Sequence, residues 1–179
     1  MTSLLDPPRL VQSIDLPDYL EALESVDLTA ATPMSVSSVD AGLPLDEYLI
    51  AQSSWYRSQG NDVCTLAACA IERIARSVRF HRVSSVAELL AVSPLFKCVN
   101  LDHIETPDDR PMSWMAEGLD RECEGYLLHE GTAARLIAWA LLDVAEDADF
   151  FHADTLHQFE MSKAAWEMAQ LDYAMECEF

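Results

Sequence analysis

Histidine and carboxylate side chains gather between positions 149 and 160, where they could supply nitrogen and oxygen ligands to a divalent metal. The candidates are Asp149, His152, Asp154, His157 and Glu160. His152 and His157 are five residues apart, about 140° round a helix, so they do not share a helical face. Asp154 is also well placed to cap the helix that follows it. We therefore expect surface histidines at a helix start, with no metal and no other cofactor.

The cysteines form no C-x-x-C pair of the kind that indicates a zinc ribbon or a redox motif. They are five in number, which does not suit a disulfide framework, and stand at Cys64, Cys69, Cys98, Cys123 and Cys177. We expect free thiols that pack as small core residues in a reducing compartment. Cys98 is included in this expectation, although His103 follows closely enough to suggest a nucleophile and its base.

Residues 76–81, R-S-V-R-F-H, place an arginine five positions before a histidine. This R-x4-H spacing resembles that of the HEPN ribonucleases, a family of compact all-helical domains that cut RNA without a metal. In that family the two residues line a cleft, usually at a dimer interface. The resemblance implies that Arg76 would stabilise the phosphate charge and that His81 would act as general acid or base. A metal-independent ribonuclease is therefore one alternative function.

Other catalytic motifs are missing from the sequence. It contains no G-x-G-x-x-G, no G-x-x-x-x-G-K-[ST], no H-E-x-x-H and no G-x-S-x-G. Only five glycines occur in the chain, which leaves little for phosphate-cradling loops. The sequence therefore favours a protein without enzymatic activity.

The strongest helical pattern covers residues 61–82, and we expect the rest of the chain to be organised around it. Asn61 can cap its start, and apolar residues recur at spacings of three and four along one face. Its second half carries a cationic edge, which consists of Arg73, Arg76, Arg79 and Arg82. This edge either pairs with acidic residues inside the fold or binds an anion or an acidic partner.

Further helices are expected on both sides of this one. Their predicted ranges are 14–26, 45–58, 86–92, 113–129, 132–145 and 154–178. Loops are expected at about 27–44 and 105–112, an extended arm at 1–14, and a helix or extended loop at 95–104. The sequence thus predicts an all-α, bundle-like single domain over 1–179, with about six to eight helices.

The predicted core draws on three of these helices. We expect the following large apolar side chains to be buried together: Leu66, Ile71, Ile74, Leu136, Trp139, Leu141, Phe159 and Trp166. In the last helix the packing side should carry Leu156, Phe159, Trp166, Ala169 and Tyr173.

The chain is strongly acidic, with 31 acidic and 11 basic residues and a net charge of −20. Such an excess repels nucleic acids and anionic membranes, so the expected partner is a basic protein surface. The amino terminus has no secretory signal pattern, and no run reaches the roughly 18 apolar residues that a membrane span needs. We expect a cytoplasmic protein; its oligomeric state is not predicted.

Two lines of carboxylates could form the binding surface. They are Glu117, Asp120 and Glu124 on one predicted helix, and Glu160 and Glu167 on another. Acidic side chains on helices can imitate the phosphates that nucleic-acid enzymes grip, as in small phage or mobile-element proteins that block restriction or CRISPR systems. The sequence favours such an inhibitor. The alternatives are an antitoxin or immunity protein that covers a basic toxin, the HEPN-like ribonuclease, or an acidic surface that serves only solubility.

Overall fold

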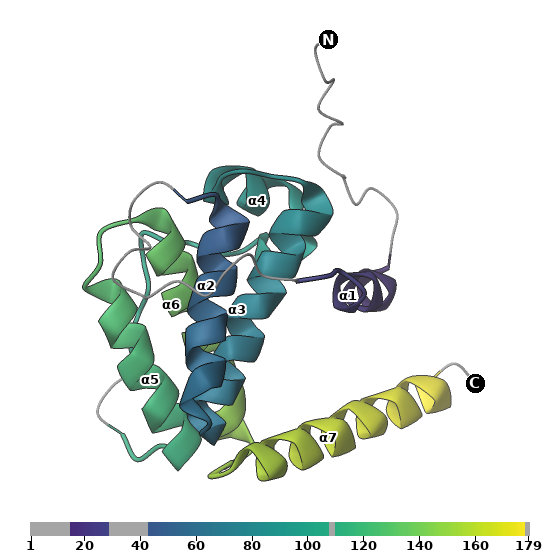
Figure 1. The fold of residues 1–179 in the computed structure, drawn as a ribbon. Coiled ribbons are helices and arrows are strands. Elements are labelled where there is room, and N and C mark those ends of the chain that lie inside the picture. Colours follow the sequence, from purple (N-terminus) through teal and green to yellow (C-terminus); the bar gives the residue numbers. More distant parts are fainter. Residues whose placement is uncertain (1–14, 29–42, 108–109, 178–179) are drawn as a thin grey trace.

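Helix α3 (Asp62–His81) is the centre of the fold, as predicted. The computed structural model describes residues 15–28, 43–107 and 110–177, and within them α3 packs against every other α-helix. The other helices are α1 (Leu16–Glu24), α2 (Leu45–Gln59), α4 (Val86–Val92), α5 (Trp114–Leu127), α6 (Thr132–Phe150) and α7 (Leu156–Cys177), with a short 3-10 helix, η2 (Pro94–Phe96). This part of the chain contains no strand, so the all-α prediction is confirmed (Figure 1).

Local signals fix both ends of α3. The Asn61 side chain accepts a hydrogen bond from the Cys64 amide at 2.9 Å, which satisfies one of the free donors at the helix start. At the other end Arg82 adopts a left-handed conformation, with φ of 55°, and stops the helix. Gly60 ends α2 in the same left-handed conformation, with φ of 68°. Helices α2 and α3 therefore form a helical hairpin.

Two helical hairpins, α2–α3 and α5–α6, pack together to form the core (Figure 1). Leu66, Ile71, Ile74, Leu136, Leu141 and Phe159 are buried, as predicted. Trp139 is only partly buried and packs edge-on against Phe96. The prediction for Trp166 was wrong, because 48% of this residue is exposed.

Tyrosine hydroxyls connect the two hairpins. Tyr56 donates to Glu122 Oε2 at 2.7 Å, and Tyr126 donates to Gln52 Oε1 at 2.5 Å. Burial raises the pKa of both tyrosines well above its ordinary value, so both remain protonated donors. These bonds satisfy polar groups that would otherwise be buried without partners.

The predicted helix boundaries hold to within a few residues, apart from two differences. Helix α6 continues to Phe150 rather than ending at 145, because Ala148 extends its buried face. Residues 94–96 form the 3-10 helix η2, where a helix or extended loop was expected. The residues described from 27–44 and 105–112 are irregular, as expected, whereas 29–42, 108–109 and the arm predicted at 1–14 lie outside the described residues.

The cap of α7 is Thr155 and not Asp154. Thr155 Oγ1 accepts from the Gln158 amide at 3.2 Å, and Gln158 Oε1 accepts from the amides of Asp154 and Thr155, which together form a capping box. The Asp154 carboxylate instead accepts from the Trp114 amide at 2.9 Å, so it fastens the start of α5 to the start of α7.

Helix α7 packs on the body only through its first turns. Leu156 is partly buried and Phe159 is buried, but every residue from 164 to 176 is exposed. The helix projects from the body on the same side of the molecule as α1 (Figure 1). The packing side predicted through Trp166, Ala169 and Tyr173 was therefore wrong beyond Phe159.

Two glycines in α5 have opposite environments, which gives a matched pair of stability predictions. A Cβ on Gly118 would lie 2.7 Å from Cγ2 of the buried Val63, whereas a Cβ on Gly125 would meet nothing within 4 Å. Alanine at 125 should stabilise the fold by about 0.5–1 kcal/mol through helix propensity. Alanine at 118 should destabilise the fold by about 1 kcal/mol or more, because overpacking against Val63 outweighs the gain in helix propensity. Urea unfolding of both variants tests this; equal stability changes would contradict the packing of α5 on α3.

Candidate binding site

The first predicted line of carboxylates lies on α5 but is not uniformly free. Glu117 and Glu124 are exposed, and Glu117 forms an ion pair with Arg121 one turn further along the helix. Asp120 is half-buried, and its Oδ1 has no hydrogen-bond partner among the described residues. Pairing and burial therefore weaken the line of charge that the sequence predicted for this face.

The environment of Asp120 predicts a pH dependence. Burial raises the pKa of its carboxyl group, and the nearby Glu124 carboxylate raises it further. The unfolded chain, with an Asp pKa of about 3.9, loses this proton at lower pH than the folded protein does. Ionisation of Asp120 therefore destabilises the fold as pH rises through this window.

Asp120→Asn should consequently raise the Tm at pH 7, and the gain should shrink as the pH falls towards about 4 and be lost below it. Glu130→Gln, at an exposed carboxylate, is the matched control and should show no such trend. Thermal unfolding between pH 3 and 7 provides the measurement. A gain that is independent of pH would show that the Asp120 carboxylate is not desolvated.

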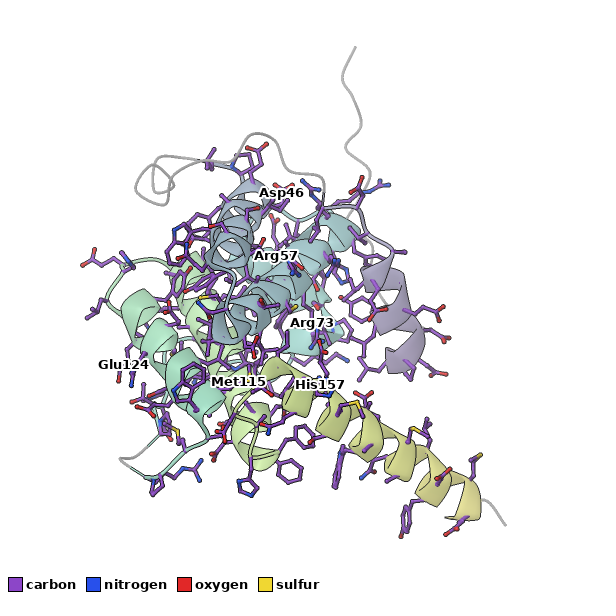
Figure 2. All side chains as sticks on the ribbon, turned by 60° about the horizontal axis from the view of Figure 1, so that its bottom comes forward. Asp46, Arg57, Arg73, Met115, Glu124 and His157 are labelled. Carbon is purple, nitrogen blue, oxygen red and sulfur yellow. The ribbon has the colours of Figure 1, made fainter. Side chains whose placement is uncertain are left out.

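The second predicted line, Glu160 and Glu167, lies on α7, and both residues are exposed. The two residues are seven apart, so they nearly eclipse one another at a separation of about 10 Å along the helix. Both line a groove of about 850 Å³ between α1, α3 and α7. Figure 2 places Glu124 on the side of the body away from the projecting part of α7, so the two predicted lines do not form one continuous surface.

The groove also contains part of the predicted cationic edge. Its walls are apolar at Leu20, Leu23 and Phe159, and its charged lining includes Arg73, Arg76, Glu72 and Lys163 as well as the two carboxylates of α7. Basic and acidic side chains alternate around it. Such a lining does not select a single anion or cation, and the groove by itself does not identify a ligand.

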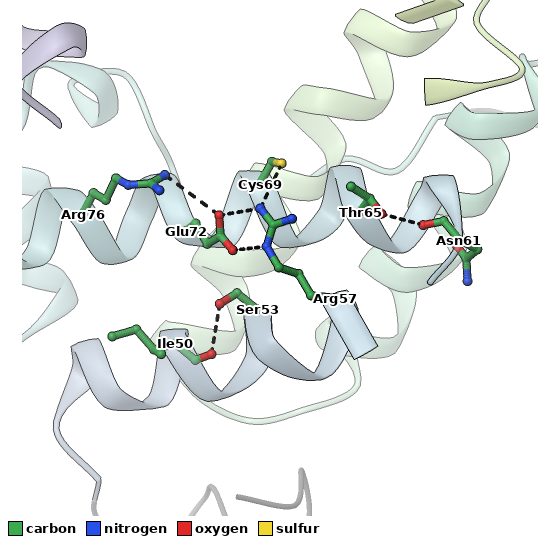
Figure 3. A network of polar contacts seen from close by, with 8 residues as sticks. All are labelled: Ile50, Ser53, Arg57, Asn61, Thr65, Cys69, Glu72 and Arg76. Atoms are coloured by element: carbon green, nitrogen blue, oxygen red, sulfur yellow. Dashed lines mark hydrogen bonds and ion pairs between the residues drawn. The ribbon is translucent and has the colours of Figure 1, made fainter. Parts of the chain in front are cut away.

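Two of the four arginines of the cationic edge, Arg76 and Arg79, have carboxylate partners inside the fold. Glu72 accepts from Arg57 Nη2 at 2.8 Å and also from Arg57 Nε, and Arg76 Nη1 lies 4.0 Å from the same carboxylate (Figure 3). Arg79 Nε donates to Asp46 at 3.0 Å, and its Nη1 donates to the Asp27 carbonyl at 2.8 Å. Within the edge, Arg76 is therefore paired inside α3 and Arg79 is paired with residues distant in sequence.

Arg76 and His81 do not meet in a cleft. Arg76 lies at the groove, whereas His81 is fully buried, with its Nε2 2.7 Å from the Tyr19 hydroxyl. The same hydroxyl lies 3.1 Å from Ser93 Oγ, so the imidazole belongs to an internal polar cluster that joins α1, α3 and the end of α4. In this arrangement His81 cannot exchange a proton with an RNA bound at the surface.

The cluster at 149–160 is likewise occupied by structural contacts. Asp149 Oδ2 pairs with Arg110 at 3.2 Å and its Oδ1 accepts from the Ser113 amide. His152 adopts a left-handed conformation, with φ of 51°, in the turn before α7. The described residues contain no group of three side chains positioned to hold a metal ion.

Among the four cysteines whose side chains the structure describes, the prediction of buried core thiols was correct for two; Cys177 lies outside them. Cys64 and Cys123 are buried, and burial raises the pKa of the Cys123 thiol to about 12. Cys69 and Cys98 are exposed, contrary to the expectation of core thiols. Cys69 faces outward because it lies on the side of α3 that borders the groove, where Arg57 Nη2 is 3.6 Å from its sulfur.

The sequence interpretation missed the large apolar side chains that α7 exposes. They are Met161, Trp166, Met168, Leu171, Tyr173 and Met175. The signal was present as two sets of residues at seven-residue spacing, one aromatic and one of methionines. The predicted packing side includes the aromatic set but not the methionines, and two sets on opposite sides of one helix cannot both face the same core.

Comparison with known proteins gives no relative. The chain matches no protein-family model, no curated protein and no solved structure. Among the described helices, none combines the length and the apolar character required to span a bilayer.

Proposed function

We propose that this protein is a non-catalytic, acidic binding protein that inhibits a nucleic-acid-handling enzyme or complex by occupying its basic surface. The observation that carries the proposal is the excess of acidic over basic side chains, 31 against 11. Arg57, Arg79 and Arg110 each neutralise one carboxylate, and none of the described acidic side chains is fully buried. The electrostatic potential around the protein is therefore dominated by carboxylates.

Exposed carboxylates can replace phosphates in a basic site because affinity for nucleic acids rests largely on lysine and arginine contacts to regularly spaced negative charge. Glu160 and Glu167 offer such a spacing on a helix that projects from the body. Glu117 and Glu124 repeat it on α5, but there Glu117 is held in an ion pair with Arg121. On α7 Lys163 lies one turn from each of the two carboxylates, but the described residues give neither carboxylate an ion pair. We therefore assign the principal contact to α7.

Capture on immobilised protein from a lysate of the source organism at low salt tests the proposal. The expected result is retention of a basic nucleic-acid-binding protein, whose binding or cleavage of duplex DNA or RNA is blocked by the pure acidic protein. Excess nucleic acid should relieve the block by competing for the same surface. Retention of a small basic toxin would favour the immunity alternative. If no basic protein is retained, or if the retained protein stays active, the proposal is wrong.

A further inference from the structure

The projecting part of α7, residues 164–176, is apolar on two opposite sides. Trp166 and Tyr173 form an aromatic stripe that continues outward from the buried Phe159, and Met161, Met168 and Met175 form a methionine stripe. Within each stripe the spacing is seven residues, which returns to nearly the same side of a helix. Met168 follows Trp166 by two residues, about 200° round the axis, so the stripes face away from one another.

Carboxylates separate the two stripes on both sides. Glu167 lies about 100° from Trp166 in one direction, and Glu176 lies about 80° from it in the other. From 164 to 176 the helix carries Glu167, Asp172 and Glu176 and no basic residue. A partner that covers the stripes must therefore accept negative charge along the borders of each.

The base of the helix is held firmly against the body. The capping box of Thr155 and Gln158 begins it, and the Leu156 amide donates to Asp62 Oδ2 at 3.0 Å. Trp166 stacks edge-on against Phe150, with ring centroids 5.3 Å apart. Residues 164–176, which are all exposed and span about 20 Å of helix, thus project from the body in a defined direction (Figure 2).

We propose that residues 164–176 of α7 are a docking helix that inserts into an apolar groove with a basic rim on a target protein. Trp166 and Tyr173 fill the floor of the groove, the methionines adapt to its opposite wall, and the carboxylates meet lysines or arginines at its edges. This inference rests on the proposed function and adds the kind of surface that the target must have.

Charge decides between a basic groove and other ways of covering this helix. A second copy of the chain would bring its own net charge of −20 and the same carboxylates against the stripes. A lipid surface would cover one stripe and leave the other in water, and anionic headgroups would repel Glu167 and Asp172. A groove with basic edges covers both stripes and neutralises the acids between them.

The test compares full-length variants for binding to the basic protein recovered in the capture experiment, which is purified and used as the probe. Trp166→Ala and Tyr173→Ala should each weaken binding by about 30-fold or more, because central aromatic anchors dominate such interfaces. Met168→Ala with Met175→Ala should have a smaller but measurable effect. Trp55→Ala is the matched control, since this exposed tryptophan lies on α2. Circular dichroism should be unchanged in all variants, and thermal unfolding should be unchanged in Tyr173→Ala, because this side chain is exposed. Trp166→Ala loses the ring contact with Phe150 and should unfold at a slightly lower temperature.

Hydrogen exchange of the complex should show protection of residues 164–176. The inference is wrong if the probe binds the Trp166 and Tyr173 variants as tightly as the parent. The proposed function would then still hold, but with the target bound to a surface other than residues 164–176. If no basic protein is recovered, both the docking-helix inference and the proposed function are wrong. Sedimentation that shows a dimer dissociated by Trp166→Ala, or binding to phosphatidylcholine vesicles lost in the same variant, would overturn the inference in favour of self-association or a membrane.

Discussion

Reversing Glu160 and Glu167 to lysine is expected to weaken binding to the basic target by about 100-fold at low salt. Each substitution removes an attraction between a carboxylate and the basic surface of the target. It also places a positive charge against that surface, and like charges that face one another across an interface weaken binding. Both side chains are exposed, so the free energy of unfolding should change by less than about 1 kcal/mol per site. Isothermal titration with the purified target measures the effect.

A matched reversal of Glu117 and Glu124 to lysine provides the control. These residues have the same spacing of seven and give the same change in net charge, but they lie on α5. We expect a loss of less than about fivefold, due only to the general field. A loss equal to that of the α7 pair would show that total charge decides binding, and a larger loss would move the contact surface to α5.

The largest effect on stability is expected for Ile71→Ala. Ile71 has no exposed surface and lies at the middle of α3, where the two hairpins meet. Removing its side chain should cost about 2–5 kcal/mol, the sum of lost burial and the cavity left behind. Met168→Ala, on the exposed part of α7, should change stability by less than about 0.5 kcal/mol. Urea unfolding of the two variants should therefore separate them clearly; a small cost at Ile71 would remove α3 from the centre of the core.

Sequence patterns predicted the helices because the signals for helix starts and ends are local. Asn61 caps α3 and Gly60 ends α2 through contacts made within a few residues. The burial of Ile71 and Leu136 followed from the same periodicity, since an apolar face in a chain of this size must be covered. These features needed no knowledge of the tertiary structure.

The missed features all depend on partners distant in sequence. His81 is buried because Tyr19, 62 residues earlier, meets it from α1. Glu72 pairs with Arg57 from the neighbouring helix, as well as with Arg76 in its own. The two sets of apolar residues on α7 indicate that part of its apolar surface lies outside the core. Periodicity shows which residues share a face, but it does not show what covers that face, so it could not show that Trp166 is among the exposed residues.

The account as a whole rests on electrostatic recognition of a basic target, and the salt dependence of the dissociation constant tests this most directly. The complex of the full chain with the purified target is measured by titration at 50 and 200 mM NaCl. Screening should weaken the affinity by at least about tenfold over this range, because the Debye length falls from about 14 to about 7 Å. An affinity that stays constant between the two salt concentrations would contradict the proposal that carboxylates bind the target in place of phosphates.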